Sequence, residues 1–304
     1  MTAIKKILRT VALQLSLIAL SNVLVAQNSN SKEFATGKMD NAIMECSYTY
    51  EYLKDTLAKD KVTEDDMLLL IGRSASSFVS KLEIVRDSVF KALSKSNMDV
   101  NAKVATVSKY KSGTQSNIYT RSDELCEVAK VGVDNLSYVE KIPDFRWNIV
   151  QDSVKNILGY DCNMATCSFR GRDYVAWFAP EVPVNAGPWK FRGLPGLIFI
   201  VADTQGHYSW KLNGIQESSK PIEFSNVKSV KTTHEKFIKT YKRYIEDPVG
   251  FLNASGGVKV KVIDRATGKE LTPAQLKKAK VTVNVNDASV SNAHGYEVIE
   301  RDIL

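Results

Sequence analysis

The sequence predicts an α+β, mainly β fold, an antiparallel β meander that forms an open, half-barrel-like sheet with two helices packed on it. Between residues 145 and 215, short β-like runs follow one another through turn-like residues without intervening helices, which is typical of antiparallel strands. Helical spacing of apolar residues occurs at 80–93 and 233–245. A content of 44% hydrophobic and 25% charged residues is ordinary for a globular protein.

The first half of the chain predicts strands on either side of one helix. Residues 43–54 alternate, with Met44 to Tyr52 at even positions on one face, which indicates a long strand. A buried run at 67–71 follows, and a capping box from Ser80 to Glu83 starts the first helix. Residues 95–116 are polar and predict a flexible excursion. Residues 118–142 predict two or three short strands.

The second half predicts a meander and a second helix. The β-like runs are 146–150, 157–160, 165–170, 174–178, 197–202 and 207–215, with turns at 151–153 and 171–173. The helix at 233–245 presents Phe237, Tyr241, Tyr244 and Ile245 as an apolar stripe. The tail contains strand-like runs at 258–263 and 281–285.

The first 26 residues are typical of a signal peptide. Lys5, Lys6 and Arg9 precede an apolar stretch at 11–25, and Ala26 is a plausible cleavage point. A retained membrane helix is the weaker alternative, because the stretch is short. We therefore expect an exported protein, periplasmic or envelope-associated and possibly secreted. It consists of one β-rich domain at 27–253 and a C-terminal extension at 254–304 packed on it.

The charge of the chain argues against a nucleic-acid partner. The formal net charge is +7. It falls to +4 for residues 27–304, where basic and acidic residues are interspersed. No later segment is long and apolar enough to cross a membrane, so no transmembrane segment is expected once the signal is removed.

Four cysteines, an even number in an exported protein, permit disulfides. Cys46, Cys126, Cys162 and Cys167 allow three pairings, between which the sequence does not choose. On one uninterrupted strand Cys162 and Cys167 would lie about 16 Å apart and on opposite faces, so a bond between them requires a turn or bulge. Their spacing does not suit a metal site.

An aromatic block is the predicted location of ligand or partner binding. All four tryptophans fall between residues 147 and 210. Aromatic residues fill cores and interfaces alike, so most of these are expected in the core. Trp189 and Phe191 lie in a loop rich in Pro and Gly, which predicts exposure. Together with Trp177 and Tyr174, they are the candidate binding residues.

A hexapeptide at 193–198 is interpreted as a bend that leads into a buried strand. It reads Gly193, Leu194, Pro195, Gly196, Leu197, Ile198. The glycines permit unusual backbone angles, and the proline lacks a donor, which suits a strand entrance. We predict a structural role, with a ligand-cradling loop as the alternative.

This hexapeptide resembles the signature of the GLPGLI family, and residues 159–162 and 170–178 resemble a second block of that family. The resemblance implies an exported envelope protein of Gram-negative bacteria, often encoded beside outer-membrane transport components and without an assigned reaction. By analogy, a signal peptide, a meander and two helices are similar to the LolA-type periplasmic lipoprotein carriers, which hold acyl chains in an open half-barrel. Fold analogy does not establish function.

The sequence contains little recognisable catalytic chemistry. The three histidines, His207, His234 and His294, have no zinc-site spacing, and no G-x-S-x-G elbow occurs. Asp173 and Glu181 are the best candidates for an acid pair. No cofactor and no metal are expected. The favoured hypothesis is a non-enzymatic binding or carrier module for a hydrophobic small molecule, a peptide or an outer-membrane transport partner. An assembly accessory of an outer-membrane transporter and a periplasmic hydrolase are the alternatives.

Overall fold

A large sheet of 13 strands dominates the part of the chain that the computed structural model describes. The described residues are 34–53, 62–224 and 228–255, with short stretches at 261–262, 267, 269–272, 275, 282–285, 288–291 and 299–301. The predicted signal peptide lies outside them. The chain divides into two units between Ala35 and Thr36, and the structure below belongs to the second.

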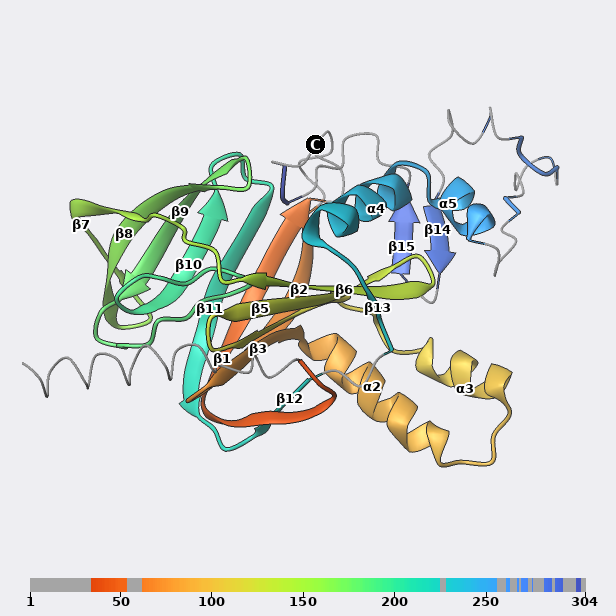
Figure 1. Ribbon diagram of the computed structural model, residues 1–304, viewed down its shortest axis with the longest axis horizontal. Helices are drawn as coiled ribbons and strands as arrows, with labels where there is room; N and C mark the ends of the chain where they lie inside the picture. The colour runs from red at the N-terminus through yellow and green to blue at the C-terminus, as the bar shows by residue number, and fades with distance from the viewer. Residues whose placement is uncertain are drawn as a thin grey trace, which may run out of the picture. The chain divides into compact units, whose positions relative to one another are not determined.

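The sheet consists of two antiparallel meanders joined side by side (Figure 1). The first contains β1 (Gly37–Leu53), β2 (Val62–Gly72), β3 (Ala75–Ser80), β4 (Ser116–Arg121), β5 (Glu124–Val131) and β6 (Asp134–Lys141). The second contains β7 (Asn148–Ile157), β8 (Tyr160–Phe169), β9 (Arg172–Ala179), β10 (Leu197–Asp203) and β11 (Tyr208–Glu217). Antiparallel pairing of β1 with β11 joins them.

Two shorter strands complete the sheet. The strand β12 (Pro221–Phe224) pairs with β1, and β13 (Val230–Lys231) runs parallel to β6. In the described part of the chain, the strand order ends at β13 on one side and β7 on the other, so the sheet is open. The predicted mainly β, open meander is confirmed.

The turns of the second meander differ from those predicted. Residues 151–153 do not form a turn but a bulge inside β7, where the register shifts between Ile149 and Val154 and Asp152 adopts a φ of 57°. A bulge accommodates extra residues without ending a strand. The hairpin turns themselves contain Leu158-Gly159 and Arg170-Gly171, all four at positive φ, as tight two-residue hairpins require.

Four helices are described where two were predicted. The helix α2 (Lys81–Ser94) begins at the Ser80 cap, and α4 (His234–Glu246) begins at a Thr233 cap. The predicted irregular excursion at 95–116 is wrong in part, because α3 (Val100–Val107) forms there from an Asp99 cap. The short α5 (Pro248–Ala254) follows α4 directly. None of the described helices is long and apolar enough to cross a membrane.

The two faces of the sheet have different neighbours. Cross-strand pairs place Leu69, Phe78, Ile118, Glu127 and Tyr138 in one row on one face, which we call the core face. The core face of β5 and β6 packs against α4 and α5. The helices α2 and α3 lie on the opposite face (Figure 1).

The packing of α4 matches its predicted stripe, but that of α2 does not. Phe237, Tyr244 and Ile245 are buried against the sheet. In contrast, Arg86 is the buried residue of α2, and Val85 in the expected apolar stripe is exposed. The helix α2 is therefore held only loosely by apolar contacts.

The tail contributes a hairpin of β14 (Thr282–Val285) and β15 (Ala288–Ser291). The first of these strands agrees with the run predicted at 281–285. Of the run predicted at 258–263, only residues 261–262 are described, and they are in neither helix nor strand.

Candidate functional site

The predicted aromatic binding residues do not form one site. Phe191 and Tyr174 are each 1% exposed, whereas Trp189 and Trp177 are partly buried. Tyr174 lies on the core face of β9, and Trp177, three residues later, points to the opposite face.

The prediction that Phe191 is exposed is wrong. Its ring contacts the rings of Tyr174 and Trp210 at centroid distances of 4.8 and 5.6 Å. Trp189 stacks on Trp210 at 5.9 Å. The Pro and Gly residues of the loop do not keep it at the surface. They let the loop fold onto the core face of the sheet.

The hexapeptide at 193–198 forms the expected bend into a buried strand. Gly193 has a φ of 98°, and Gly196 a φ of 156°. A Cβ atom on Gly196 would lie 2.2 Å from the carbonyl oxygen of Ala179. Leu197 and Ile198, the first residues of β10, are fully buried. The geometry supports the structural interpretation of this segment.

No cysteine is in a disulfide in the structure. Cys46, Cys126, Cys162 and Cys167 are free and buried. Cys162 and Cys167 lie on β8, which pairs with β9 without a shift in register, so the turn that a bond between them requires is absent. Burial raises the pKa of each thiol, to about 12 for Cys46, Cys126 and Cys167 and to about 11 for Cys162. Such thiols are unreactive.

The candidate acid pair does not converge. Asp173 is near the start of β9, whereas Glu181 follows its end, and both are exposed. The strand between them spans about 20 Å, far more than the 5–10 Å that separates the carboxyl groups of glycosidases. His207 Nδ1 lies 3.2 Å from the Arg172 guanidinium, in a structural network. His294 lies outside the described residues. Among those residues no cluster suits a metal ion.

A buried ionic cluster around Lys190 was not predicted. The Lys190 side chain is 0% exposed, and its Nζ lies 3.0 Å from Glu127 Oε2, 2.7 Å from Glu300 Oε1 and 3.6 Å from Glu140 Oε1. It also donates a hydrogen bond to the Tyr138 hydroxyl. The cluster thus connects β5, β6, the loop before β10 and the C-terminal residues 299–301.

Arg170 and His234 extend this cluster through contacts with Glu140 and Glu300. Arg170 lies 2.6 Å from Glu140 and 2.9 Å from His234 Nδ1. Because a guanidinium only donates, Nδ1 accepts, and the opposite nitrogen of His234 donates to Glu300 Oε2 at 2.6 Å.

The electrostatics of the cluster fix its charges. Burial lowers the pKa of Lys190, but the surrounding Glu127, Glu300 and Glu140 raise it above its ordinary value. Burial raises the pKa of Glu300, but the opposite effect of Lys190 and His234 is larger, and the net result is a pKa of about 2. An ammonium that stays protonated and has no contact with solvent is neither a nucleophile nor a base. The cluster is therefore structural.

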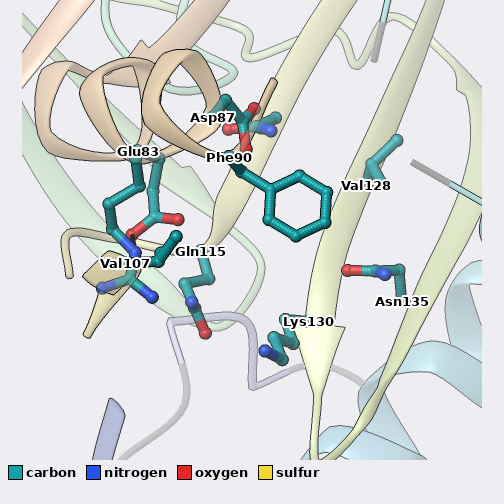
Figure 2. A pocket seen from close by; sticks show the side chains of 10 residues that line it. Glu83, Asp87, Phe90, Val107, Gln115, Val128, Lys130 and Asn135 are labelled. Atoms are coloured by element: carbon teal, nitrogen blue, oxygen red, sulfur yellow. Dashed lines mark ion pairs between the residues drawn. The ribbon is translucent and has the colours of Figure 1, made fainter. Parts of the chain in front are cut away.

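A groove lies on the opposite face, between α2, the end of α3 and strands β4 to β6 (Figure 2). Its volume is about 240 Å³. Phe90 extends from α2 toward the strand that carries Val128 (Figure 2). The lining residues are Glu83, Arg86, Asp87, Phe90, Val107, Gln115, Asn117, Val128, Lys130 and Asn135.

Polar contacts join α2 to the segment between α3 and β4. Arg86 donates to the carbonyl of Tyr110 at 2.7 Å, and Glu83 accepts from the backbone of Gly113 at 2.8 Å. Their side chains thus anchor the chain after α3.

The groove combines apolar and polar groups. Desolvation raises the pKa of the Asp87 carboxyl. The Asn117 side-chain oxygen is inaccessible to solvent and accepts no hydrogen bond from the described residues. No sequence pattern pointed to this groove, because its residues come from five elements, two helices and three strands.

The chain is similar to one protein family over a short region and to solved structures over part of its fold. A family described as "Protein of unknown function (Porph_ging)" matches residues 170–200, which include β9 and the hexapeptide. No curated protein matches the chain.

Two solved structures of PNGF-II, in space groups P21 and C2, resemble the chain with a TM-score of 0.45 each. Their sequence identities are 10% and 12%, and the matches cover 66% and 73% of this chain. The chain spans about a third of the length of these structures, 33% and 35%. Similarity at this level says nothing about what the chain binds.

Proposed function

We propose that the protein is a non-enzymatic binding module of the cell envelope that holds a short peptide segment in the groove beneath α2. The observation that carries this proposal is the groove itself, in which Phe90 and Val128 face acidic, basic and amide side chains. A peptide offers an apolar side chain, backbone donors and acceptors, and both signs of charge.

The composition of the lining favours a peptide over an acyl chain. A purely apolar chain would bury Lys130 and Asp87 against hydrocarbon. A bound peptide instead offers backbone groups that form hydrogen bonds with these charged side chains and with the amides of Gln115 and Asn135. The aromatic block supplies no competing site, since Phe191 and Tyr174 are buried.

The envelope location belongs to the same proposal. It is supported by the signal-like residues 1–26 and by the resemblance of residues 193–198 to the GLPGLI signature. In that setting the peptide belongs to an outer-membrane transport component, whose assembly the protein assists. With this partner, the protein is both a peptide-binding module and an assembly accessory of an outer-membrane transporter.

A peptide display selection on the purified protein tests the proposal. We expect enriched peptides that bind with micromolar affinity and that bind the Phe90→Ala variant about tenfold more weakly. Phe90 is 57% exposed, so its truncation leaves the fold intact. The matched control is Ile149→Ala, an exposed apolar residue on β7, which should bind like the wild type.

Chemical shifts locate the bound peptide. Amide signals of Val128, Lys130 and Asn135 should move on binding, while those of β7 to β9 stay unchanged. Failure to enrich any peptide, or equal binding by Phe90→Ala, contradicts the proposed function.

A further inference from the structure

The helices α2 and α3 also expose apolar residues away from the groove. On α3, Val100 is 75% and Val104 53% exposed, and on α2, Ile84 is 39% and Val85 46% exposed. Met98, between the helices, is exposed as well. So many aliphatic side chains at the surface of one helical pair indicate an interaction surface.

This surface adjoins the groove but shares no lining residue with it: Val107 lines the groove, whereas Val100 and Val104, on the same side of α3, do not. Ile84, Lys91 and Lys95 are spaced by seven and four residues, so they lie on one side of α2. Phe90, six residues after Ile84, lies on the other side and lines the groove. Val100 and Val104, four residues apart, share one side of α3.

The net positive charge of residues 27–304 is concentrated in the same segment. Residues 81–111 contain seven basic and three acidic residues, a net charge of +4. Residues 27–304 as a whole also carry +4, so the rest of that range is neutral. Lys91, Lys95, Lys109 and Lys111 are exposed.

We propose that the outward surface of α2 and α3 docks on an anionic lipid bilayer. Aliphatic side chains beside flexible lysines are typical of helices that lie in a membrane interface. The apolar residues enter the boundary of the acyl chains, and the lysine ammonium groups reach anionic headgroups.

The residue types favour lipid over an acidic protein as the partner. Protein interfaces are enriched in Trp, Tyr and Arg and depleted in Lys. Here the exposed cations are lysines, and the exposed apolar residues of both helices are aliphatic apart from Phe90, which lines the groove. Docking would hold the groove near the membrane, but it does not depend on the groove being occupied.

Flotation with lipid vesicles tests the proposal. The probes are vesicles of phosphatidylcholine alone and of two parts phosphatidylcholine to one part phosphatidylglycerol. We expect binding to the anionic vesicles that weakens as sodium chloride rises from about 0.1 to 0.5 M, because salt screens the headgroup charge. All variants keep the same residues 1–33, so any difference between them reports on the helices.

Two double variants separate the contributions of charge and burial. Lys91→Glu with Lys95→Glu should weaken partitioning at least about twentyfold, since each lysine contributes about a factor of five. Val100→Ser with Val104→Ser should weaken it about tenfold at every salt concentration, since the apolar contribution is not screened. The control Lys38→Glu with Lys236→Glu changes the net charge equally at exposed positions on β1 and α4 and should retain binding.

Three results would overturn the proposal. They are equal loss of binding in the control, undiminished binding in both double variants, and no binding of the wild type to anionic vesicles. In the last case, salt-sensitive binding to poly-glutamate would assign the surface to an acidic protein. Peptide binding by the two double variants is expected to be normal, so failure of docking and failure of the proposed function are distinguishable.

Discussion

Replacing Lys190 by methionine should strongly destabilise the protein. The Lys190 side chain is buried against the core face of the sheet, with 0% exposure, and its ammonium is within 4 Å of three carboxylates. Methionine keeps most of the volume but removes the charge. Glu300, whose side chain is 1% exposed, then loses the ammonium at 2.7 Å, and Glu127 loses the same ammonium at 3.0 Å.

The size of the effect follows from this burial. Breaking a buried ion pair by removing one partner costs about 3–5 kcal/mol, because the remaining charge is left uncompensated. We expect a loss in that range in the free energy of unfolding, measured by urea denaturation with tryptophan fluorescence. The control Lys236→Met, an exposed lysine on α4, should change the free energy of unfolding by less than about 0.5 kcal/mol.

A second variant tests the cause of the loss. Adding Glu300→Gln to Lys190→Met removes one of the uncompensated charges, so it should recover at least about 1 kcal/mol. A loss below about 1 kcal/mol for Lys190→Met alone would refute the reasoning. A double variant that is further destabilised would also refute it.

Four further outcomes are expected. Gly196→Val should abolish soluble expression or greatly lower the melting temperature, because its side chain would collide with the Ala179 carbonyl; a native melting temperature would contradict this. Phe191→Ala should cost about 3–5 kcal/mol of stability by urea denaturation, and a neutral result would place the ring outside the core. The four thiols should resist a thiol reagent until the protein unfolds, and intact mass should show no disulfide. Since the folded pKa of Glu300 is about 2 against 4.5, its contribution of roughly 3 kcal/mol is present above pH 4.5 and is lost as the pH falls toward 2, so Glu300→Gln should flatten acid unfolding curves in that window.

Local patterns in the sequence predicted much of the fold. The alternation before residue 54 identified β1 because one face of that strand is buried and the other is not. The capping box at Ser80 marked the start of α2, since a cap acts on the next three residues, and the apolar stripe marked α4. The hexapeptide identified the entrance to β10 because the effect of its glycines is also local: they permit the positive φ angles of the bend at residues 193 and 196.

Features that depend on distant contacts were not predictable. The helix α3 has eight residues and none of them is buried. Its three valines recur at helical spacing, but a run of two turns inside a polar segment is too short to distinguish a helix from an irregular excursion. The burial of Phe191 and the Lys190 cluster depend on pairing between strands far apart in the chain. Glu127, Lys190 and Glu300 meet across 173 residues, and each alone reads as an ordinary surface charge.

The hexapeptide and its preceding loop act together on the core face. A Cβ on Gly187 would lie 2.8 Å from the carbonyl oxygen of Phe191, so this glycine permits a tight fold of the loop. That fold directs Lys190 and Phe191 into the sheet, and the close approach at Gly196 then returns the chain to β10. The segment is therefore explained by the packing and charge balance of the core. The core face is filled in this way, and the groove proposed to hold a peptide lies on the opposite face, beneath α2.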